Sequence, residues 1–403
     1  MERTKGFTHE AFPNRIAPVK VLHLVKTVVG ASWAYGQMRV LRSLGVEVTV
    51  ALPSATEGLA PRYREAGIEV IKADLDLHMR NPRQCLSTLK ACRKLVESVR
   101  PDLIHSHFVS TTLVARIALG KHSSIPRVFQ VPGPLHLEHR FFAACDIRSA
   151  GPQDYWIGSC RWTQQKYREL GVPSDRVFLS YYGTDLAIFG RPRTGQLRRE
   201  LSLAAETPLV GMVSYIYAPK WFVGQVRGLK GHEDFIDALK IVREVRPEIR
   251  GVIIGGAWAR ASRYENHLRK LGERACNGSL TFLGTRRDVP GIYPDLDLAV
   301  VPSHSENVGG AVEPLLSDVP VVANNVGGLP DLVQDGKTGW LVPSRNPKAL
   351  ARAILDALGQ KDEARRRTAE GHRLAERLFD VERTGAEVAA IYERILARPA
   401  KPL

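Results

Sequence analysis

The chain has 403 residues, of which 44% are hydrophobic and 25% are charged, a composition typical of a soluble globular protein. This length exceeds one ordinary hydrophobic core and favours two domains. No run of about 18 apolar residues occurs and the first residues lack an apolar signal-peptide stretch, so the sequence predicts neither a membrane-spanning helix nor secretion. The formal net charge of +15 favours an anionic partner, whether nucleic acid, a nucleotide or an acidic membrane.

Cysteines and basic residues narrow the choice of compartment and partner. The five cysteines are scattered and lack Cys-x-x-Cys spacing, which predicts a reducing, cytoplasmic compartment and no structural zinc site. The one dense basic run, 365–367, lies in a helical pattern without interleaved aromatic residues. It indicates a solvated helix face, and we expect no nucleic-acid partner.

The first half of the chain alternates strand and helix patterns. A buried strand pattern at 19–25 leads through a glycine-containing loop into a helix pattern ending near Ser43, and a second strand pattern follows at 46–52. Further strand patterns occupy 68–71, 103–105, 127–131, 155–158 and 177–180. Alternation of this kind predicts a parallel, doubly wound α/β domain.

The second half repeats this organisation after a segment rich in Gly, Pro and Arg at 185–205, which is typical of a linker. Strand patterns lie at 209–214, 251–256, 280–285, 298–301 and 319–323, and a helix pattern lies at 232–245. Three helix patterns follow at 347–358, 363–378 and 382–396. We therefore expect a second doubly wound domain with helices packed on its surface.

The segment 300–343 contains a strand, a loop and a helix start twice in succession. Its first loop holds acidic, amide and small residues: Glu306, Asn307, Val308, Gly309 and Gly310. The helix pattern begins near Val308 and carries Glu313. Glycines let backbone amides approach a ligand closely, and carboxylates accept hydrogen bonds from sugar hydroxyls. A helix-terminal acid is the alternative for Glu306, whereas the apolar neighbours of Glu313 argue against simple exposure.

Lys230 precedes the helix pattern at 232–245, at the mouth of a predicted central strand. There a lysine can neutralise a diphosphate while the helix start supplies amide donors. The alternative is an ordinary exposed lysine at a turn. Lys220 and Arg227 flank the same loop and either add positive charge to such a site or face solvent.

The first half of the chain contains two features that give only weak support for a nicotinamide site or a metal site. Gly30 and the loop to Trp33 match half of a dinucleotide fingerprint but lack the G-x-G-x-x-G spacing, so a nicotinamide site has little support. The histidines near predicted strand ends are His105, His107, His136 and His139. No carboxylate or cysteine stands at helical ligand spacing to them, so we expect hydrogen-bonding or core roles and no metal site.

Taken together and in this order, the motifs resemble those of the retaining, nucleotide-sugar-dependent glycosyltransferases of the GT-B fold. The similarity is to the fourth family, which includes bacterial surface-polysaccharide mannosyl-, glucosyl- and N-acetylglucosaminyltransferases. The matching motifs span nearly the whole chain: Gly30, 104–107, 182–185 with Phe189, 230–232, 282–284, 301–303, Glu306, Glu313 and 326–330. The resemblance implies two Rossmann-like α/β domains facing a cleft, an acceptor domain at 16–188 and a donor domain at 206–375. It also implies a C-terminal helix, 376–403, that returns to the first domain.

The resemblance also implies roles for particular residues. Glu313 would hold the donor ribose, and Glu306 with Asn307 and the amides of 308–310 would hold the donor sugar. Lys230 would bind the diphosphate, with Gly30 touching it from the first domain. The catalytic set implied in this way is Lys230, Glu306 and Arg227, with Lys220 as a further donor contact and His107 and His136 as acceptor or sugar contacts.

Three departures from the family pattern affect these assignments. Six residues separate Glu306 from Glu313 where the family has seven, so either Glu306 is displaced or Ser305 takes its place. Met212 stands where the family has an arginine, which leaves Lys220 or Arg227 as the replacement. Pro132 stands where the family has a histidine, with His136 as the substitute.

The expected activity is retaining, metal-independent transfer from a nucleoside-diphosphate sugar to a glycan or polyprenyl-linked acceptor in bacterial cell-surface polysaccharide synthesis. No cofactor is expected beyond that co-substrate. A nucleotide-sugar epimerase of the same fold and a non-catalytic sugar-nucleotide-binding protein are the alternatives.

The segment 78–100 is relevant to where in the cell the protein acts. It carries Arg80, Arg83, Lys90, Arg93, Lys94 and Arg100, with Leu86, Leu89, Val96 and Val99 at helical spacing. A basic amphipathic helix of this kind would let a cytoplasmic enzyme rest on the inner face of the plasma membrane. The alternative is an ordinary domain helix whose apolar stripe faces the sheet.

Overall fold

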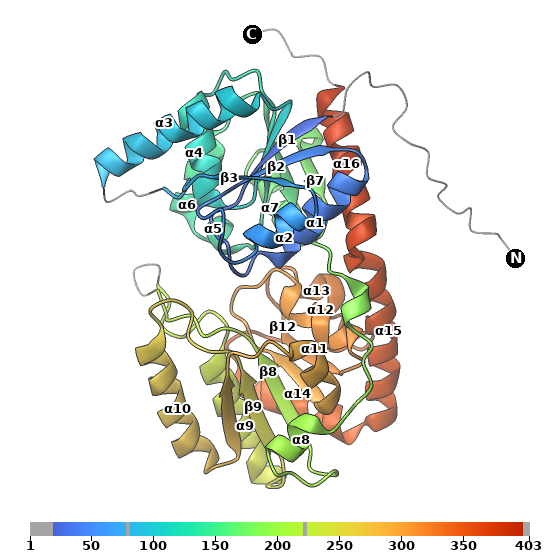
Figure 1. Ribbon diagram of the computed structural model, residues 1–403. Coiled ribbons are helices and arrows are strands. Elements are labelled where there is room, and N and C mark those ends of the chain that lie inside the picture. The colour runs from blue at the N-terminus through green and yellow to red at the C-terminus, as the bar shows by residue number, and fades with distance from the viewer. Residues whose placement is uncertain (1–18, 78–80, 221–223, 398–403) are drawn as a thin grey trace, which may run out of the picture. The chain divides into compact units, whose positions relative to one another are not determined.

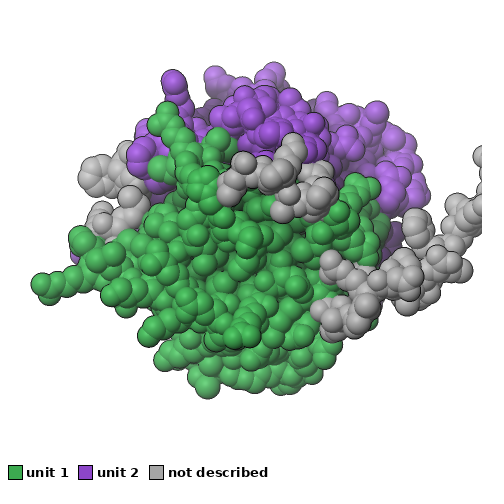
Figure 2. Space-filling model, turned by 90° about the horizontal axis from the view of Figure 1, so that it is seen from above, with its two compact units in different colours: residues 1–131, 145–157, 381–403 green, residues 132–144, 158–380 purple. Residues whose placement is uncertain are grey.

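The computed structural model describes residues 19–77, 81–220 and 224–397 and contains two parallel sheets with flanking helices (Figure 1). The chain forms two compact units, coloured separately in Figure 2. Unit 1 comprises Met1–Val131, Cys145–Ile157 and Val381–Leu403, and unit 2 comprises Pro132–Ala144 and Gly158–Asp380. Among the described residues, no helix has the length and apolarity needed to cross a membrane.

The first sheet has seven strands in the order β3-β2-β1-β4-β5-β6-β7. Its strands are β1 Lys20–Leu24, β2 Glu47–Leu52, β3 Glu69–Lys72, β4 Leu103–Ser106, β5 Arg127–Gln130, β6 Asp154–Gly158 and β7 Val177–Leu179. The strand order reverses between β1 and β4, which pair in parallel with His23 opposite His105. In such sheets, ligands bind beside the carboxyl ends of the two strands at this switch point.

The helices of this half are α1 Ser32–Ser43, α2 Ala60–Glu65, α3 Pro82–Val99, α4 Val109–Leu119, α5 Leu135–Glu138, α6 Arg140–Ser149 and α7 Arg161–Glu169. Residues two apart in a strand share one face of the sheet. Leu22 and Leu24 of β1 share such a face and pack in one core with residues of α3 and α4. On unit 1 the C-terminal helix α16, Val381–Leu396, packs against α1. A Cβ at Gly385 would lie 2.5 Å from Val40 Cγ1, so this close packing needs glycine.

The second sheet has six strands in the order β10-β9-β8-β11-β12-β13. They are β8 Leu209–Val213, β9 Arg250–Ile254, β10 Leu280–Gly284, β11 Leu298–Val301, β12 Val321–Asn324 and β13 Trp340–Val342. The helices around them are α8 Gln196–Glu200, α9 His232–Val245, α10 Ser262–Cys276, α11 Val289–Ile292, α12 Gly309–Leu316, α13 Leu329–Leu332, α14 Pro347–Gly359 and α15 Lys361–Phe379.

Unit 2 is doubly wound because its strands bury side chains on both faces. Val210 and Val300 lie in a core with apolar residues of α9 and α14. Their neighbours Leu209 and Val301 lie in a second core with residues of α12 and α15. Strands with near-continuous apolar sequence are expected where helices cover both sides of a parallel sheet. The predicted fold of two doubly wound α/β domains is thus confirmed.

The segment at 185–205, predicted to be a linker, is structured and belongs to unit 2. The Asp295 carboxylate accepts hydrogen bonds from the backbone amides of Gly195 at 2.7 Å and Leu197 at 2.8 Å. Arg198 donates to Asp297 at 2.5 Å. These contacts join the segment to the loop before β11.

Candidate functional site

The clearest candidate site in unit 2 lies at the switch point of the six-stranded sheet, where the strand order reverses between β8 and β11. Two loops leave the carboxyl ends of these strands: one runs from β8 to α9, and the other from β11 to α12. Doubly wound folds bind ligands at this position. The sequence placed Lys230 on the first loop and Glu306 on the second.

Gly231 joins the two loops closely. Its φ of 73° is left-handed, and a Cβ at this position would lie 1.9 Å from the Pro302 carbonyl oxygen. Only glycine fits both requirements without displacing backbone. The His304 amide donates to the Leu229 carbonyl at 2.8 Å, which completes the junction. The Lys-Gly-His motif therefore fixes Lys230 against the loop that carries Glu306.

Lys230 and Glu306 form an ion pair, with Nζ 2.5 Å from Oε2. The Ser303 hydroxyl donates to the same oxygen at 3.0 Å, and the Asn307 amide donates to Oε1 at 3.2 Å. The Lys230 and Glu306 side chains are 21% and 10% exposed, so neither is fully buried. Ser305, the alternative to Glu306, hydrogen-bonds the Glu138 carboxylate instead. The residue that faces Lys230 is therefore Glu306.

The start of α12 adjoins this ion pair. A Cβ at Gly310 would lie 3.7 Å from Glu306 Oε2, whereas a Cβ at Gly309 would meet nothing within 4 Å. The first turn of a helix presents unpaired amides and a partial positive charge. Val308 is the residue before this turn. The sequence-predicted amides at 308–310 are thus placed beside Glu306, with open space at Gly309.

Glu313 lies one turn further along α12 and is half-buried. Its carboxylate hydrogen-bonds the buried hydroxyl of Tyr293. Burial raises the pKa of Glu313, and the bond from Tyr293 opposes that rise only in part. The apolar neighbours of Glu313 in the sequence argued against simple exposure, but nothing in the sequence indicated its partner Tyr293, which is brought near by tertiary packing.

The second glycine turn supports the same loop. Gly327 has a φ of 52°, and its Cβ would lie 1.9 Å from the Glu306 carbonyl oxygen. The Gly328 amide donates to that oxygen at 3.2 Å. Asn307 donates from Nδ2 to the Ser159 hydroxyl at 3.0 Å, and no described residue hydrogen-bonds its buried Oδ1. The repeated strand-loop-helix motif therefore builds one connected set of loops.

The candidates for the missing family arginine differ in environment. Met212 is 2% exposed and packs in the core beside α9, so position 212 supplies no charge. Arg227 donates to Asp234 at 2.6 Å and to Asp237 at 2.8 Å, so two carboxylates already balance its charge. Lys220 is exposed. A diphosphate would compete with Asp234 and Asp237 for Arg227.

Tyr217 is a site residue that sequence reasoning missed. It lies in the loop after β8, within electrostatic reach of Lys230 and Glu306. Burial raises the pKa of Tyr217, so its hydroxyl is a hydrogen-bond donor at neutral pH. Its ring approaches Trp258, with centroids 6.1 Å apart. The paired tyrosines of the S-Y-I-Y sequence were the available signal.

His136 lies beside these loops in unit 2. Its Nε2 and the Tyr167 hydroxyl share a hydrogen bond of 3.0 Å. The preceding Pro134 approaches Gly327 closely, since a Cβ on that glycine would lie 3.2 Å from Pro134 Cγ. His139 instead packs on Phe142, with ring centroids 5.1 Å apart. The segment containing His136 therefore belongs to the same neighbourhood as Glu306.

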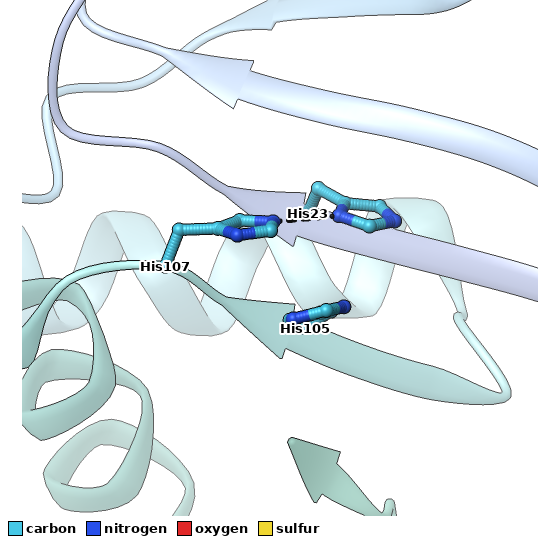
Figure 3. A group of neighbouring side chains, drawn as sticks. All are labelled: His23, His105 and His107. Atoms are coloured by element: carbon cyan, nitrogen blue, oxygen red, sulfur yellow. Dashed lines mark hydrogen bonds between the residues drawn. The ribbon is translucent and has the colours of Figure 1, made fainter. Parts of the chain in front are cut away.

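His107 lies in a different place, in a buried cluster of unit 1 with His23 and His105 (Figure 3). His23 Nδ1 and His107 Nε2 share a hydrogen bond of 3.0 Å, and their ring planes differ by 14°. His105 stacks on His107 with centroids 4.2 Å apart and planes 19° apart. His105 Nδ1 and the Tyr392 hydroxyl of α16 share a hydrogen bond of 2.5 Å.

The ligand nitrogens of this cluster lie within 4.8 Å of one another, so its fit to a metal ion can be judged. A metal is bound through lone pairs that lie in the imidazole planes and converge on one point. His105 lies in a plane stacked against that of His107, so their lone pairs do not converge. The arrangement is that of a hydrogen-bonded stack rather than a preformed metal centre.

The histidine stack is held in its neutral form. Burial lowers the pKa of His23 to about 3. Burial, with a smaller contribution from the neighbouring imidazoles, lowers the pKa of His105 and His107 well below the ordinary value. Each ring then offers one donor and one acceptor at neutral pH.

Comparisons with known proteins agree with this architecture. The model described as "Glycosyl transferase 4-like domain" matches residues 31–183, and "Glycosyl transferases group 1" matches residues 221–374. The D-inositol 3-phosphate glycosyltransferase of Thermobispora bispora is 28% identical over 89% of this chain and 88% of its own length. The lipopolysaccharide core biosynthesis mannosyltransferase LpsB of Rhizobium meliloti is 27% identical over 43% of this chain and 50% of its own length.

Among solved structures, the Anabaena protein HepE in complex with UDP-glucose superimposes with a TM-score of 0.77. It is 22% identical and covers 93% of this chain and 99% of its own. The chain therefore belongs to the group 1, or family four, glycosyltransferases of the GT-B fold, which transfer a sugar from a nucleotide-sugar donor.

Proposed function

We propose that the protein is a retaining glycosyltransferase whose donor site lies at the switch point of unit 2. The observation that carries this proposal is the Lys230–Glu306 pair beside the start of α12. Lys230 would meet the diphosphate, while Glu306 and the amides of 308–310 would meet the hydroxyls of the donor sugar. Glu313 would accept hydrogen bonds from the ribose.

The chemistry requires stabilisation of a leaving nucleoside diphosphate. As the bond between C1 of the sugar and the phosphate oxygen breaks, negative charge grows on that oxygen. The Lys230 ammonium and the partial positive charge at the start of α12 oppose this charge. The acceptor oxygen bonds to C1 from the same face, and its proton passes to the departing phosphate oxygen. Configuration at C1 is thereby retained.

We further propose that transfer needs no divalent ion. Lys230, with Lys220 or Arg227, supplies the positive charge that a metal would otherwise bring to the diphosphate. Arg227 would contribute after exchanging Asp234 and Asp237 for phosphate. Full transfer after EDTA treatment is the expected result, and an absolute requirement for magnesium or manganese would contradict it.

The proposed acceptor is a glycan or a polyprenyl-linked sugar of bacterial cell-surface polysaccharide synthesis. The similarity to the Rhizobium lipopolysaccharide core mannosyltransferase supports this class. Helix α3 adds support, because Arg83, Lys90 and Lys94 are exposed along it and Leu86 is 60% exposed. Such a helix suits a cytoplasmic enzyme that rests on an anionic membrane surface.

The deciding experiment follows the anomeric proton by NMR while UDP-, GDP-, ADP- and TDP-sugars are each supplied with a panel of octyl glycosides. Transfer with retained configuration at C1 is expected for one donor. Inversion would contradict the retaining mechanism. An epimer formed from donor alone would indicate an epimerase, and binding without turnover would indicate a non-catalytic protein.

A further inference from the structure

A buried aspartate joins the two loops of the proposed donor site in unit 2. Asp234 lies in the first turn of α9, and its side chain is 3% exposed. One carboxylate oxygen, Oδ1, lies 2.6 Å from Nη1 of Arg227, on the loop from β8 to α9. The other oxygen, Oδ2, lies 2.7 Å from Nε2 of His304, on the loop from β11 to α12. Asp234 is therefore shared between two side chains from different loops.

Asp234 is ionised in this arrangement. Burial alone would raise the pKa of Asp234, but the hydrogen bonds from His304 and Arg227 outweigh burial and hold that pKa below its ordinary value. An ionised carboxylate only accepts hydrogen bonds, so His304 donates from Nε2. The lone pair of the neutral imidazole is then on Nδ1, which is the atom at which His304 can bind a proton.

Arg227 can turn without movement of its backbone. Its side chain is 42% exposed, and Nη1 also donates to the Asp237 carboxylate at 2.8 Å. The next residue, Gly228, is fixed, because its amide donates to the Tyr264 hydroxyl at 2.8 Å and a Cβ there would lie 2.5 Å from that oxygen. The guanidinium therefore swings about a fixed backbone shortly before Lys230 in the chain.

Asp234 would be left with an unbalanced charge when the donor diphosphate draws Arg227 away. A buried ion that loses its partner is strongly destabilising. Asp237 is 35% exposed and water can take the place of the guanidinium, whereas the buried Asp234 depends on His304. Departure of one positive charge beside a remaining carboxylate favours a proton on the neighbouring imidazole.

The other charges beside His304 do not oppose this proton. The His304 amide donates to the Leu229 carbonyl, next to Lys230. Lys230 is paired with Glu306, so the two charges largely cancel. A bound diphosphate would add further negative charge. The charged groups on both loops thus favour an imidazolium at His304 once Arg227 has left Asp234.

We propose that His304 is a positioning residue of the donor site, which binds a proton from solvent at Nδ1 when Arg227 leaves Asp234 for the donor diphosphate. The protonated His304 then balances the buried Asp234, and Arg227 adds its charge to that of Lys230. No covalent bond changes apart from the new N–H bond. This inference rests on the proposed function and adds His304 and Asp234 to the residues on which donor binding depends.

The first test counts the protons that accompany donor binding. Titration calorimetry with UDP-, GDP-, ADP- and TDP-sugars, in buffers of different ionisation enthalpy at about pH 7, gives this number. The diphosphate of a nucleotide sugar does not titrate near this pH, so any uptake belongs to the protein. An imidazole whose titration midpoint rises by about one unit through pH 7 gains about half a proton. Wild type should show this uptake with the sugar that it binds.

The matched variants are His304→Gln and His372→Gln. Glutamine can still donate to Asp234 but cannot take up a proton. His304→Gln should therefore lose the uptake, and its donor dissociation constant should rise about tenfold. His372 of α15 belongs to another pair, with Nδ1 2.9 Å from the Asp318 carboxylate, and His372→Gln should behave as wild type. Donor binding by wild type without proton uptake, or full uptake by His304→Gln, would overturn the inference and leave the proposed function standing.

The second test separates positioning from a structural role. Asp234→Asn removes the buried charge, so His304→Gln in that background should cause no further loss of donor affinity. An equal loss in both backgrounds would indicate a structural role and overturn the inference. Melting temperatures establish that each variant is folded.

The third test needs no donor. Arg227→Gln removes the cation permanently, so the pH midpoint of the His304 imidazole signal in NMR spectra should rise by about one unit relative to wild type. The signal is identified by its absence from His304→Gln. An unchanged midpoint would refute the coupling between Arg227 and His304. Failure of wild type to bind any nucleotide sugar would instead refute the proposed function.

Discussion

Lys230 is the side chain on which the proposed donor site depends most. Replacing it by alanine would remove the charge that we propose to oppose the developing phosphate anion, so we expect transfer to fall about a hundredfold or more. Lys240→Ala is the matched control, because Lys240 is an exposed lysine further along α9. Steady-state transfer rates of the two variants provide the measurement. Equal rates for Lys230→Ala and wild type would remove Lys230 from the mechanism.

Glu313 should make donor binding sensitive to acid. In the proposed site the ionised carboxylate offers two acceptor oxygens to the ribose hydroxyls, and protonation turns one of them into a hydroxyl donor. Burial raises the pKa of Glu313 above its ordinary value. Protonation therefore begins at a higher pH than for an exposed glutamate. We expect the donor dissociation constant to rise as pH falls through this raised pKa. The Glu313→Gln variant should bind the donor weakly, and its dissociation constant should depend less on pH. If titration calorimetry gave this variant the same dissociation constants across pH as wild type, that result would contradict the assignment.

The histidine stack should make folding sensitive to acid. Burial lowers the pKa of His23 to about 3, whereas the unfolded chain binds this proton near pH 6.5. Between these two pH values the unfolded chain binds a proton at His23 that the folded protein does not. The contribution of His23 to the free energy of unfolding is therefore fully present above about pH 6.5, and it falls by about 1.4 kcal/mol for each pH unit of acidification below that value. His23→Gln should reduce the slope of the unfolding free energy against pH in denaturant titrations. His122→Gln, at an exposed position, should leave it unchanged; equal slopes for wild type and His23→Gln would contradict the account.

The candidate residues were predictable where they form local motifs. Lys230, Glu306 and Glu313 each follow a strand pattern and adjoin glycine or a helix start. Such local patterns can be recognised in the sequence without knowledge of the tertiary structure. Tyr217, Tyr293 and His23 were not predicted. Each reaches its partner through a contact between distant segments, as when β1 places His23 opposite His105.

Helix α3 combines a core face with an exposed basic face. Cys92, Val96 and Val99 are buried in the core of unit 1. The second half of the apolar stripe therefore faces the domain interior, as in an ordinary domain helix. Leu86 is 60% exposed, and Arg83, Lys90 and Lys94 are exposed along the helix. Arg80, also part of the expected basic face, lies outside the described residues. The helix therefore offers both charge and an apolar side chain to a surface.

We expect salt-sensitive sedimentation of the protein with phosphatidylglycerol vesicles. Each basic group close to the lipid contributes about 1 kcal/mol, so changing Arg83, Lys90 and Lys94 together to Gln should abolish most binding. A matched variant changes three exposed arginines of unit 2, Arg352, Arg365 and Arg373, and keeps the same net charge. Equal loss in both variants, or equal binding to neutral vesicles, would argue for a soluble acceptor.

Secondary structure was predictable from periodicity for most strands and for the C-terminal helices. The helix patterns at 347–358, 363–378 and 382–396 became α14, α15 and α16 with nearly the same ends. Strand β13 was missed, because Trp340–Val342 is too short to show a period. The segment at 185–205 was interpreted as a linker because its order depends on Asp295 and Asp297, about a hundred residues away.

The order of motifs along the chain was enough to predict the two-domain α/β architecture. Each half carries its own alternation of strands and helices, and each sheet reverses its strand order once. The composition of the units was less predictable. The segment Pro132–Ala144 belongs to unit 2 although strands of unit 1 precede and follow it, because Pro134 and Glu138 contact the loops around Gly327 and Ser305.

The net charge of +15 suits a protein whose substrate carries a diphosphate, but charge alone does not locate the site. We place the proposed site at the switch point in unit 2, where Lys230 and Glu306 lie beside the start of α12, the helix that carries Glu313. We propose that a nucleoside-diphosphate sugar binds there.

Titration calorimetry tests this claim most directly, with UDP-, GDP-, ADP- and TDP-sugars added to wild type, Lys230→Ala and Lys240→Ala. We predict that one nucleotide sugar binds wild type and Lys240→Ala equally and binds Lys230→Ala at least about tenfold more weakly. Binding of that sugar to Lys230→Ala as tightly as to wild type, or binding of no panel member to wild type, would contradict it.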